Sequence, residues 1–354
     1  MAAFDIKKLL QSVVAHGASD LHLVSRTEPQ IRLDGALKPV NLPKLTGDDI
    51  EEMCYSLITE KQKQHFEENS ELDFALELPE IGRFRANFYK TLGEMAAAFR
   101  IIPIDVPSLD DLGAPHIFKE LIKREKGLIL VTGPTGSGKS TTLAALLNEI
   151  NEHEQKHIVT VEDPVEFIHQ NKKAVFSHRG VGEDTKSFAT ALKYAMRQDP
   201  DIILIGEMRD KETIEAALTA AETGHLVFGT LHTSSAPGTI NRIIDVFTGD
   251  EQPQIRAMIS TSLVSVIAQS LLPKIGGGRV AAHEILVTNH AISNLIREDK
   301  VHQIYSQMQL GQEGSGMQTQ TQALLKFLRE GKISRETALQ YANKPEELAK
   351  AVVR

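Results

Sequence analysis

An octapeptide with the complete phosphate-binding loop pattern lies near the middle of the chain. Its residues are Gly133, Pro134, Thr135, Gly136, Ser137, Gly138, Lys139 and Ser140, with Thr141 next. In such a loop the glycines let backbone N–H groups converge on phosphates, the lysine reaches the β- and γ-phosphates, and the last hydroxyl binds Mg²⁺. An apolar run, Leu128–Thr132, precedes the loop, and good helix formers, Leu143–Ile150, follow it. The pattern and its strand–loop–helix context predict a site for ATP and Mg²⁺.

A cluster of carboxylates follows a second apolar run. The run Ile158–Val161 leads into Glu162 and Asp163, and Glu166 lies three residues further on. Taken alone, three carboxylates after a strand favour a solvated acidic turn. Whether they are candidate catalytic groups therefore depends on where the fold places this strand end.

A third apolar run has the form of a Walker B strand. Ile202–Ile205 is followed by Gly206 and Glu207, and such a strand delivers a carboxylate to the Mg²⁺ and water side of a phosphate-loop site. Aspartate is the usual residue at this place, so Glu207 is a departure. Ser140 and Glu207 are the candidate ligands for Mg²⁺.

The fourth apolar run, Leu226–Leu231, lies between two histidines. His225 and His232 are seven residues apart, so on a strand they point to opposite faces and lie roughly 23 Å apart, at about 3.3 Å per residue. This spacing argues against a metal ion shared by the two. His232 falls at the carboxyl end of its run, as the other candidate groups do.

The positions of these groups relative to the apolar runs carry the interpretation. Apolar runs that alternate with helical patterns indicate a buried parallel sheet. In open α/β sheets, ligands bind beyond the carboxyl ends of the strands. All four runs end there in a polar group: the phosphate loop, the carboxylate cluster, Glu207 and His232. Unrelated surface turns would not coincide in this way, so we interpret the four groups as one hydrolytic site.

The first hundred residues have the pattern of a small α/β domain. The expected elements are helices at Ile6–Ala15 and Gly47–Lys63 (capped by Thr46) and strands at Asp20–Val24, Gln30–Leu33 (with Asp34-Gly35 as a hairpin turn), Arg83–Tyr89 and Met95–Ile102.

Arginines of this domain are candidates for neutralising phosphate charge, because positive charge stabilises phosphoryl transfer. Arg83 and Arg85 have the same parity on one expected strand and share a face, and Arg100 lies on the next. Arg179 and Arg209 are further candidates. Surface arginines are usually only solvated, so the sequence alone gives these residues little weight.

Prolines and a change of pattern mark the domain boundaries. Pro103, Pro107 and Pro115 predict a linker at residues 105–118, between an N-terminal domain at 1–104 and a phosphate-loop domain at 119–354. From Gln254 onward the chain is expected to be mostly helical, with a helical C-terminal subdomain from about residue 270 and a flexible turn at Gly276–Gly278.

Composition excludes several classes of protein. The net charge of −8 argues against non-specific nucleic-acid binding, which needs a surplus of Lys and Arg. Cys54 is the single cysteine, so neither an internal disulfide nor a four-cysteine zinc site is expected, and a reducing compartment is indicated. The first ten residues lack a signal-peptide pattern, and no run of about eighteen apolar residues is present. Any contact with a membrane would then go through a partner.

Taken together, these residues resemble the secretion-type ATPases and, within them, the type IV pilus retraction motors. The likeness covers nearly the whole chain and is carried, besides the phosphate loop, by Ala18–Leu23, Arg32-x-Asp34-Gly35, Arg83-Phe84-Arg85-x-Asn87, an acidic "Asp box" at Glu162–Glu166, Asp199–Asp210, a "His box" from Thr223 to Thr233, a retraction signature at Ala291–Glu298, and Gly316–Thr319.

The resemblance implies a fold, an assembly and a role for each site residue. The fold would be α/β, an N-terminal PAS-like domain followed by a RecA-like ATPase core with a helical C-terminal part. Glu166 would polarise the attacking water, Glu207 would be the Walker B residue, and His232 would sense the γ-phosphate. Arg85 and Arg100 would neutralise phosphate charge. The assembly would be a hexameric ring, with ATP bound between the two domains near a subunit boundary.

The same resemblance implies a homohexamer in the cytoplasm, held peripherally at the inner membrane by a pilus platform protein, without nucleic acid. Three departures from the family pattern are Ser293 in place of arginine in the signature, Lys90-Thr91-Leu92-Gly93 in place of a turn with arginine, and Gly180 in place of an acidic residue.

Three alternatives stay open. One is an accessory retraction paralogue. The second is a pilus extension or type II secretion ATPase, against which the single cysteine and the start of the chain at the PAS-like part argue. The third is a scaffold that binds ATP without hydrolysing it.

Overall fold

A computed structural model describes residues 5–33, 36–102, 105–310 and 312–352, and the side chains of residues 312 and 313 are not described. The chain divides into two compact units. The first comprises Met1–Asp105 and Pro164–Ile168, and the second comprises Val106–Asp163 and His169–Arg354.

Of the stretch expected to be a linker, 105–118, Asp105 groups with the first unit and residues 106–118 group with the second. Leu109 and Phe118 are buried in a core of that unit, together with Ile129 and Leu146. The prolines of this stretch do interrupt regular structure, but its apolar side chains have a core to enter. Apolar burial therefore fixes the segment where the proline pattern alone indicated a loose connection.

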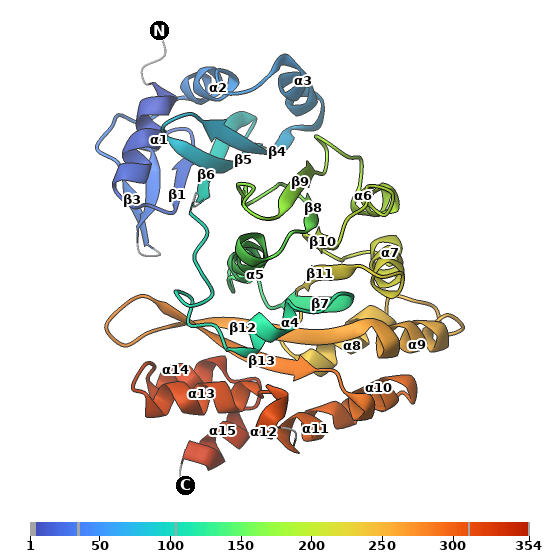
Figure 1. The fold of residues 1–354 in the computed structure, drawn as a ribbon. Helices are drawn as coiled ribbons and strands as arrows, with labels where there is room; N and C mark the ends of the chain where they lie inside the picture. Colours follow the sequence, from blue (N-terminus) through green and yellow to red (C-terminus); the bar gives the residue numbers. More distant parts are fainter. Residues whose placement is uncertain (1–4, 34–35, 103–104, 311, 353–354) are drawn as a thin grey trace. The chain divides into compact units, whose positions relative to one another are not determined.

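The first unit is a six-stranded antiparallel sheet with three helices, in the strand order β3-β2-β1-β6-β5-β4 (Figure 1). Its elements are α1 (Ile6–Ala15), β1 (Asp20–Leu23), β2 (Gln30–Leu33), β3 (Ala36–Pro39), α2 (Gly47–Tyr55), α3 (Glu60–Asn69), β4 (Glu71–Leu78), β5 (Gly82–Thr91) and β6 (Glu94–Ile102).

One face of this sheet is apolar and the other is polar, as the two-residue period of a strand requires. Phe74, Phe88 and Phe99 belong to the core, where their rings pack edge to face. On the opposite face, Arg85 lies directly across from Arg100 on the neighbouring strand. The arginines of this domain that were singled out in the sequence therefore share one polar face.

The prediction of a single helix at Gly47–Lys63 is wrong, because the structure has two helices, α2 and α3, over this stretch. The break is a second capping box: the Thr59 hydroxyl accepts from the backbone N–H of Gln62, and the Gln62 side chain accepts from the backbone N–H of Thr59. Thr46 caps α2 as expected, in a capping box with Asp49. The expected turn at Asp34-Gly35 lies outside the described residues.

The second unit contains a seven-stranded sheet in the order β13-β12-β7-β11-β10-β8-β9 (Figure 1). Its strands are β7 (Gly127–Thr132), β8 (His157–Glu162), β9 (Val175–Gly180), β10 (Ile202–Ile205), β11 (Leu226–Leu231), β12 (Leu263–Pro273) and β13 (Arg279–Val287). All neighbours pair in parallel except β12 and β13. The four apolar runs are thus confirmed as strands of one parallel sheet.

Helices connect these strands and continue to the end of the chain. They are α4 (Ile117–Leu121), α5 (Lys139–His153), α6 (Phe188–Ala195), α7 (Lys211–Glu222), α8 (Ala236–Ile244), α9 (Gln252–Ser262), α10 (His290–Arg297), a 3₁₀ turn at Val301–Gln303, α11 (Ile304–Leu310), α12 (Gln312–Ser315), α13 (Gln320–Arg329), α14 (Arg335–Tyr341) and α15 (Pro345–Val352).

The expectation of a mostly helical chain from Gln254, and of a helical subdomain from about residue 270, is wrong in part. The long strands β12 and β13 extend the sheet beside β7, and the helices resume only at α10. Because β12 lies between two other strands, most of its residues are buried, and its apolar residues do not alternate regularly with polar ones. Such a run lacks the alternation that would distinguish it from a buried helix. The glycines at Gly276–Gly278 lie between these two strands.

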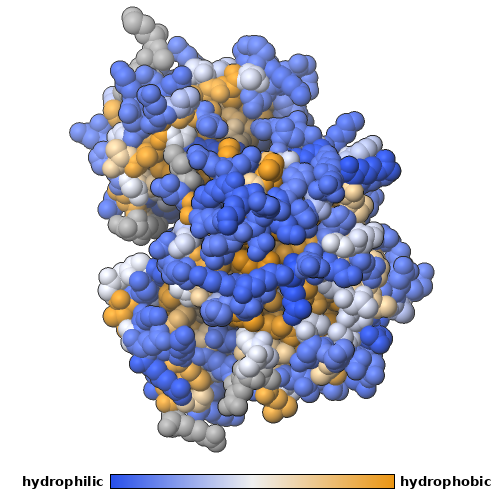
Figure 2. Space-filling view, viewed as in Figure 1, coloured by the Kyte–Doolittle hydropathy of each residue, from blue (hydrophilic) through white to orange (hydrophobic). Residues whose placement is uncertain are grey.

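Hydrophilic residues cover most of the visible face of the molecule (Figure 2). Among the described residues, none of the helices combines the length and the apolar character that crossing a membrane requires.

Candidate nucleotide site

The strand registers bring the predicted site segments to one edge of the sheet. Thr132, the last residue of β7, lies opposite Leu231, the last residue of β11. Ile205, at the end of β10, lies opposite Gly229 on one side and Val161 on the other. The segments that follow these four strands therefore leave the sheet at the same edge, as the sequence predicted.

The phosphate loop leads directly into a long helix. Gly138 adopts the left-handed backbone conformation, with φ of 86°, and occupies the N-cap of α5. A glycine takes this conformation without strain and has no side chain that could cap the helix. The N–H groups of the first turn of α5, beginning at Lys139, are therefore directed toward a ligand, and helix N-termini favour anions.

Lys139 folds back over its own loop. Its ammonium group donates to the backbone carbonyl oxygens of Gly133, at 2.9 Å, and Pro134, at 3.1 Å. The positive charge is thus held at the loop, where the phosphates of a nucleotide bind in proteins of this type.

Glu207 and His232 form the central pair of the site. His232 Nε2 lies 2.7 Å from Glu207 Oε1, and Arg209 Nε also donates to Glu207 Oε1. Burial alone would raise the pKa of Glu207, but the Arg209 and His232 side chains more than offset burial and hold it below its ordinary value. Glu207 is therefore ionised at neutral pH and is oriented by two partners.

The segment that carries Glu207 crosses over the neighbouring strand β11. The backbone N–H of Met208 donates to the carbonyl of Thr230 at 3.0 Å, and the Thr230 hydroxyl donates to the carbonyl of Gly206 at 2.5 Å. A side chain at Gly229 would come within 2.4 Å of Met208 Sδ. Gly229 therefore leaves room for Met208, so that Glu207 can reach His232 at the end of β11.

The carboxylates of the Asp box are divided between the two units. Glu162 is the last residue of β8 and is half-buried, and Asp163 is exposed. Glu166 belongs to the segment Pro164–Ile168, which groups with the first unit. The second unit by itself therefore assembles the phosphate loop, Glu162, Asp163, Glu207 and His232, whereas Glu166 belongs to the other unit.

Arg85 and Arg100 are held in ion pairs within the first unit. Arg85 Nη2 lies 2.6 Å from Asp73 Oδ2, and Arg100 Nε lies 2.8 Å from Asp20 Oδ1. Burial tends to raise the pKa of Asp20, but hydrogen bonds from Ser19 and Arg100 and the positive charge of Arg100 hold it below its ordinary value. Each arginine is thus orientated by a carboxylate on the same sheet.

The two further candidate arginines have local partners. Arg209 pairs with Glu207, as described above, and Arg179 lies on β9, where its guanidinium donates to the backbone carbonyls of Asp184 and Ala191. Arg179 therefore stabilises the chain around β9.

A buried amide at the loop was not among the predicted site residues. Gln269 of β12 donates from Nε2 to the backbone carbonyl of Ser137 at 2.6 Å. The signal in the sequence is weak, because a single glutamine in an apolar run is as compatible with an exposed turn of a helix as with a buried strand.

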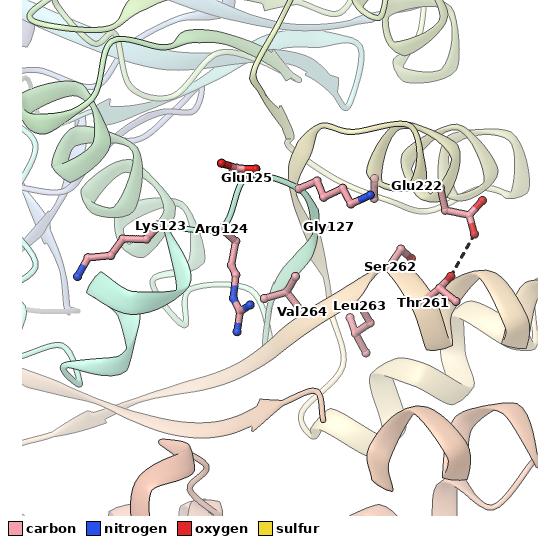
Figure 3. Close-up of a pocket in the computed structure, with 11 residues that line it drawn as sticks. Lys123, Arg124, Glu125, Gly127, Glu222, Thr261, Ser262, Leu263 and Val264 are labelled. Carbon is pink, nitrogen blue, oxygen red and sulfur yellow. Dashed lines mark hydrogen bonds between the residues drawn. The ribbon is translucent and has the colours of Figure 1, made fainter. Parts of the chain in front are cut away.

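A cavity of about 770 Å³ lies at the other end of the sheet, where β7 and β12 begin (Figure 3). It is lined by residues of the segment before β7, including Arg124 and Lys126, and by the ends of α7 and α9, where Thr261 donates to Glu222. Lys123, another basic residue of the lining, donates to Glu120 at 2.8 Å.

The chain is similar to known proteins over most of its length. The family described as "Type II/IV secretion system protein" matches residues 2–277. The "Type IV pilus retractation ATPase PilT" of Pseudomonas aeruginosa is 52% identical over 343 residues, covering 97% of this chain and 99% of that protein. The "Twitching motility protein" of Neisseria gonorrhoeae is 48% identical over 98% of this chain and 93% of its own length.

A solved structure is similar over the same extent. The "Crystal Structure of the Pilus Retraction Motor PilT and Bound ADP" superposes with a TM-score of 0.91 at 48% sequence identity, covering 98% of this chain and 99% of that chain. The α/β fold class and the resemblance to the retraction motors predicted from the sequence are therefore confirmed. The chain belongs to the type II/IV secretion system protein family.

Proposed function

We propose that this chain is the ATP-hydrolysing motor that powers type IV pilus retraction and twitching motility. The observation that carries the proposal is the placement of the phosphate loop and the Glu207–His232 pair at one edge of the sheet. In addition, this chain matches retraction ATPases over almost its whole length.

Lys139 and the start of α5 bind the phosphates in this proposal. Transfer of the γ-phosphoryl group to water depends mainly on positioning and on stabilising charge spread over the phosphate oxygens. The Lys139 ammonium, which contacts loop carbonyls here, exchanges these contacts for the β- and γ-phosphates. The N–H groups of the first turn of α5 add a fixed positive potential at the same place.

The residues present suit Mg²⁺. Mg²⁺ prefers hard oxygen ligands and is usually held by one or two carboxylates together with phosphates and water. We assign its protein ligands to the Ser140 hydroxyl and the Glu207 carboxylate, which the low pKa keeps ionised. When bound, the ion neutralises phosphate charge. His232 orients Glu207 and is the candidate sensor of the γ-phosphate.

Glu166 is proposed to polarise the attacking water, with Glu162 and Asp163 as alternative bases. A carboxylate activates a water molecule when it accepts a proton from it. Arg85 and Arg100 are proposed to neutralise phosphate charge. Each role is a prediction that a single substitution tests.

The proposed assembly is a homohexamer that acts on a pilus platform protein from the cytoplasmic side of the inner membrane. Two alternatives predict different results. A scaffold that binds ATP would show no turnover, and a strain that lacks an accessory retraction paralogue would still twitch. The ionised Glu207 and its contact with His232 favour hydrolysis over the scaffold.

Steady-state ATP hydrolysis by the purified chain tests the enzymatic part of this proposal. Lys139→Ala should abolish turnover, because it removes the cation of the loop. Lys126→Ala is the matched control, since Lys126 is exposed just before β7, at the opposite end of that strand from the loop. Normal turnover by Lys139→Ala, or none by the unaltered chain, would overturn the assignment.

A further inference from the structure

Gln269 lies directly behind the phosphate loop. It is on β12, where Ala268 is paired with Thr132, the last residue of β7. Gln269 is therefore level with Gly133, the first residue of the loop. Its side chain is in the interior, with only 3% of the residue exposed.

The Gln269 amide connects the two ends of the segment that binds phosphate and metal. Nε2 donates to the carbonyl oxygen of Ser137 at 2.6 Å, and Oε1 accepts from the Thr142 hydroxyl at 2.8 Å. Ser137 comes before Lys139 and Ser140 in the chain, and Thr142 comes after them. One buried side chain thus holds the loop on both sides of the residues assigned to the phosphates and to Mg²⁺.

The orientation of this amide is determined by its partners. The Ser137 carbonyl can only accept a hydrogen bond, so the NH₂ group of Gln269 must face it. On the other side, His283 Nε2 lies 3.2 Å from Gln269 Oε1. Burial lowers the pKa of His283 to about 4, so its imidazole is neutral at physiological pH and donates from Nε2.

β12 also approaches the loop through its backbone. A Cβ atom added at Gly133 would lie 2.3 Å from the Gln269 carbonyl oxygen, and one added at Gly138 would lie 2.9 Å from Gln269 Nε2. Two glycines of the phosphate-loop pattern therefore face this one residue. The loop is packed against Gln269 as well as bonded to it.

We propose that Gln269 is a positioning residue that holds the phosphate loop in its binding conformation before a nucleotide arrives. The inference rests on the proposed function, because it concerns the same loop. If the loop is already in its binding conformation, none of the binding free energy is used to order it. Loss of the Gln269 hydrogen bonds should therefore weaken the binding of ADP and ATP and raise KM. The kcat should change less, because the ground state and the transition state lose the same interaction.

Two near-isosteric substitutions test the donor function of this amide. Gln269→Met removes the hydrogen bonds at every pH, and we expect the Kd for ADP to rise roughly 10- to 100-fold, as expected for a buried partner left unsatisfied. Gln269→Glu places a carboxyl at the same position. Ionised at pH 9, the carboxyl repels the Ser137 carbonyl oxygen; protonated at pH 6, it donates as the amide does, since burial raises its pKa. Its affinity for ADP, relative to the unaltered chain at the same pH, should recover at pH 6.

Calorimetric titration with ADP gives Kd, and thermal unfolding shows that each variant is folded. Gln254→Met and Gln254→Glu are matched controls on an exposed position of α9 and should bind ADP normally. The inference is overturned if folded Gln269→Met binds ADP as the unaltered chain does, or if kcat falls while KM and Kd stay unchanged. If the unaltered chain fails to bind ADP, it is the proposed function that is wrong.

Discussion

Glu207 and His232 should act as a unit in ATP hydrolysis. Their side chains meet at 2.7 Å, and the Glu207 side chain is 20% exposed and the His232 side chain 45% exposed. Hydrogen bonds to charged groups contribute about 1.5–3 kcal/mol each. Glu207→Gln and His232→Gln each remove one partner of this contact, so each should lower kcat by about 10- to 100-fold or more, at roughly 1.4 kcal/mol per factor of ten.

A double-mutant cycle separates the pair from its surroundings. The double variant Glu207→Gln/His232→Gln should be only slightly slower than the slower single variant, because the shared contact is lost once. The coupling in activation free energy should be about 1.5–3 kcal/mol. Phosphate release under saturating ATP and Mg²⁺ measures the four kcat values.

Arg209→Gln is the matched control for this cycle. Arg209 contacts the same carboxylate oxygen, but 75% of its side chain is exposed. An exposed ion pair contributes at most about 1 kcal/mol of free energy, so this variant should slow turnover less than about fivefold. The reasoning is refuted if the increases in activation free energy from Glu207→Gln and His232→Gln sum to that of the double variant within about 0.5 kcal/mol. The two groups would then act independently.

Three further predictions follow from single residues. Glu166→Gln should keep ADP affinity and slow hydrolysis by orders of magnitude; an unchanged kcat would move the role to Glu162 or Asp163. Arg100→Ala should reduce ATP turnover although Arg100 lies outside the phosphate-loop unit, and normal turnover would remove it from the proposed site. Stability should fall as the pH drops from 7.5 to 5.5, because the fold keeps His283 neutral, with a pKa of about 4, while the unfolded chain binds a proton near pH 6.5. His283 should account for about 1 kcal/mol of that loss. In urea unfolding at both pH values, the free energy of unfolding of His283→Gln should change by about that much less than that of the unaltered chain.

The sequence predicted the parts of the fold that have strong local signals. The four apolar runs became β7, β8, β10 and β11 because strands buried on both faces are nearly continuously apolar. Their common direction then placed the candidate groups at one sheet edge. The phosphate loop needed no tertiary information, since its residue pattern and the elements beside it determine it.

Elements without such signals were missed. β9 is a short strand at the edge of the sheet, with the sequence Val-Phe-Ser-His-Arg-Gly and only Gly180 buried. β4 was also missed, although Leu72, Phe74, Leu76 and Leu78 alternate along it and are buried. Here the alternation was present in the sequence and would have been sufficient.

Contacts between distant segments could not be predicted from one sequence. Gln269 meets Ser137 only because β12 lies beside β7, and the pairing of parallel strands depends on the whole chain. The proximity of His232 to Glu207 was inferred from strand ends, but the hydrogen bond itself depends on Gly229 making room for Met208. Such packing details belong to tertiary structure.

The number of surface pili and the twitching of a strain that lacks this chain test the central claim most directly. A retraction motor predicts many surface pili and no twitching, and a plasmid copy of the unaltered chain should restore movement where a Lys139→Ala copy does not. A strain without pili would contradict the account, because it would make the chain an extension motor. Normal twitching would contradict it as well, since the chain would then be dispensable for retraction.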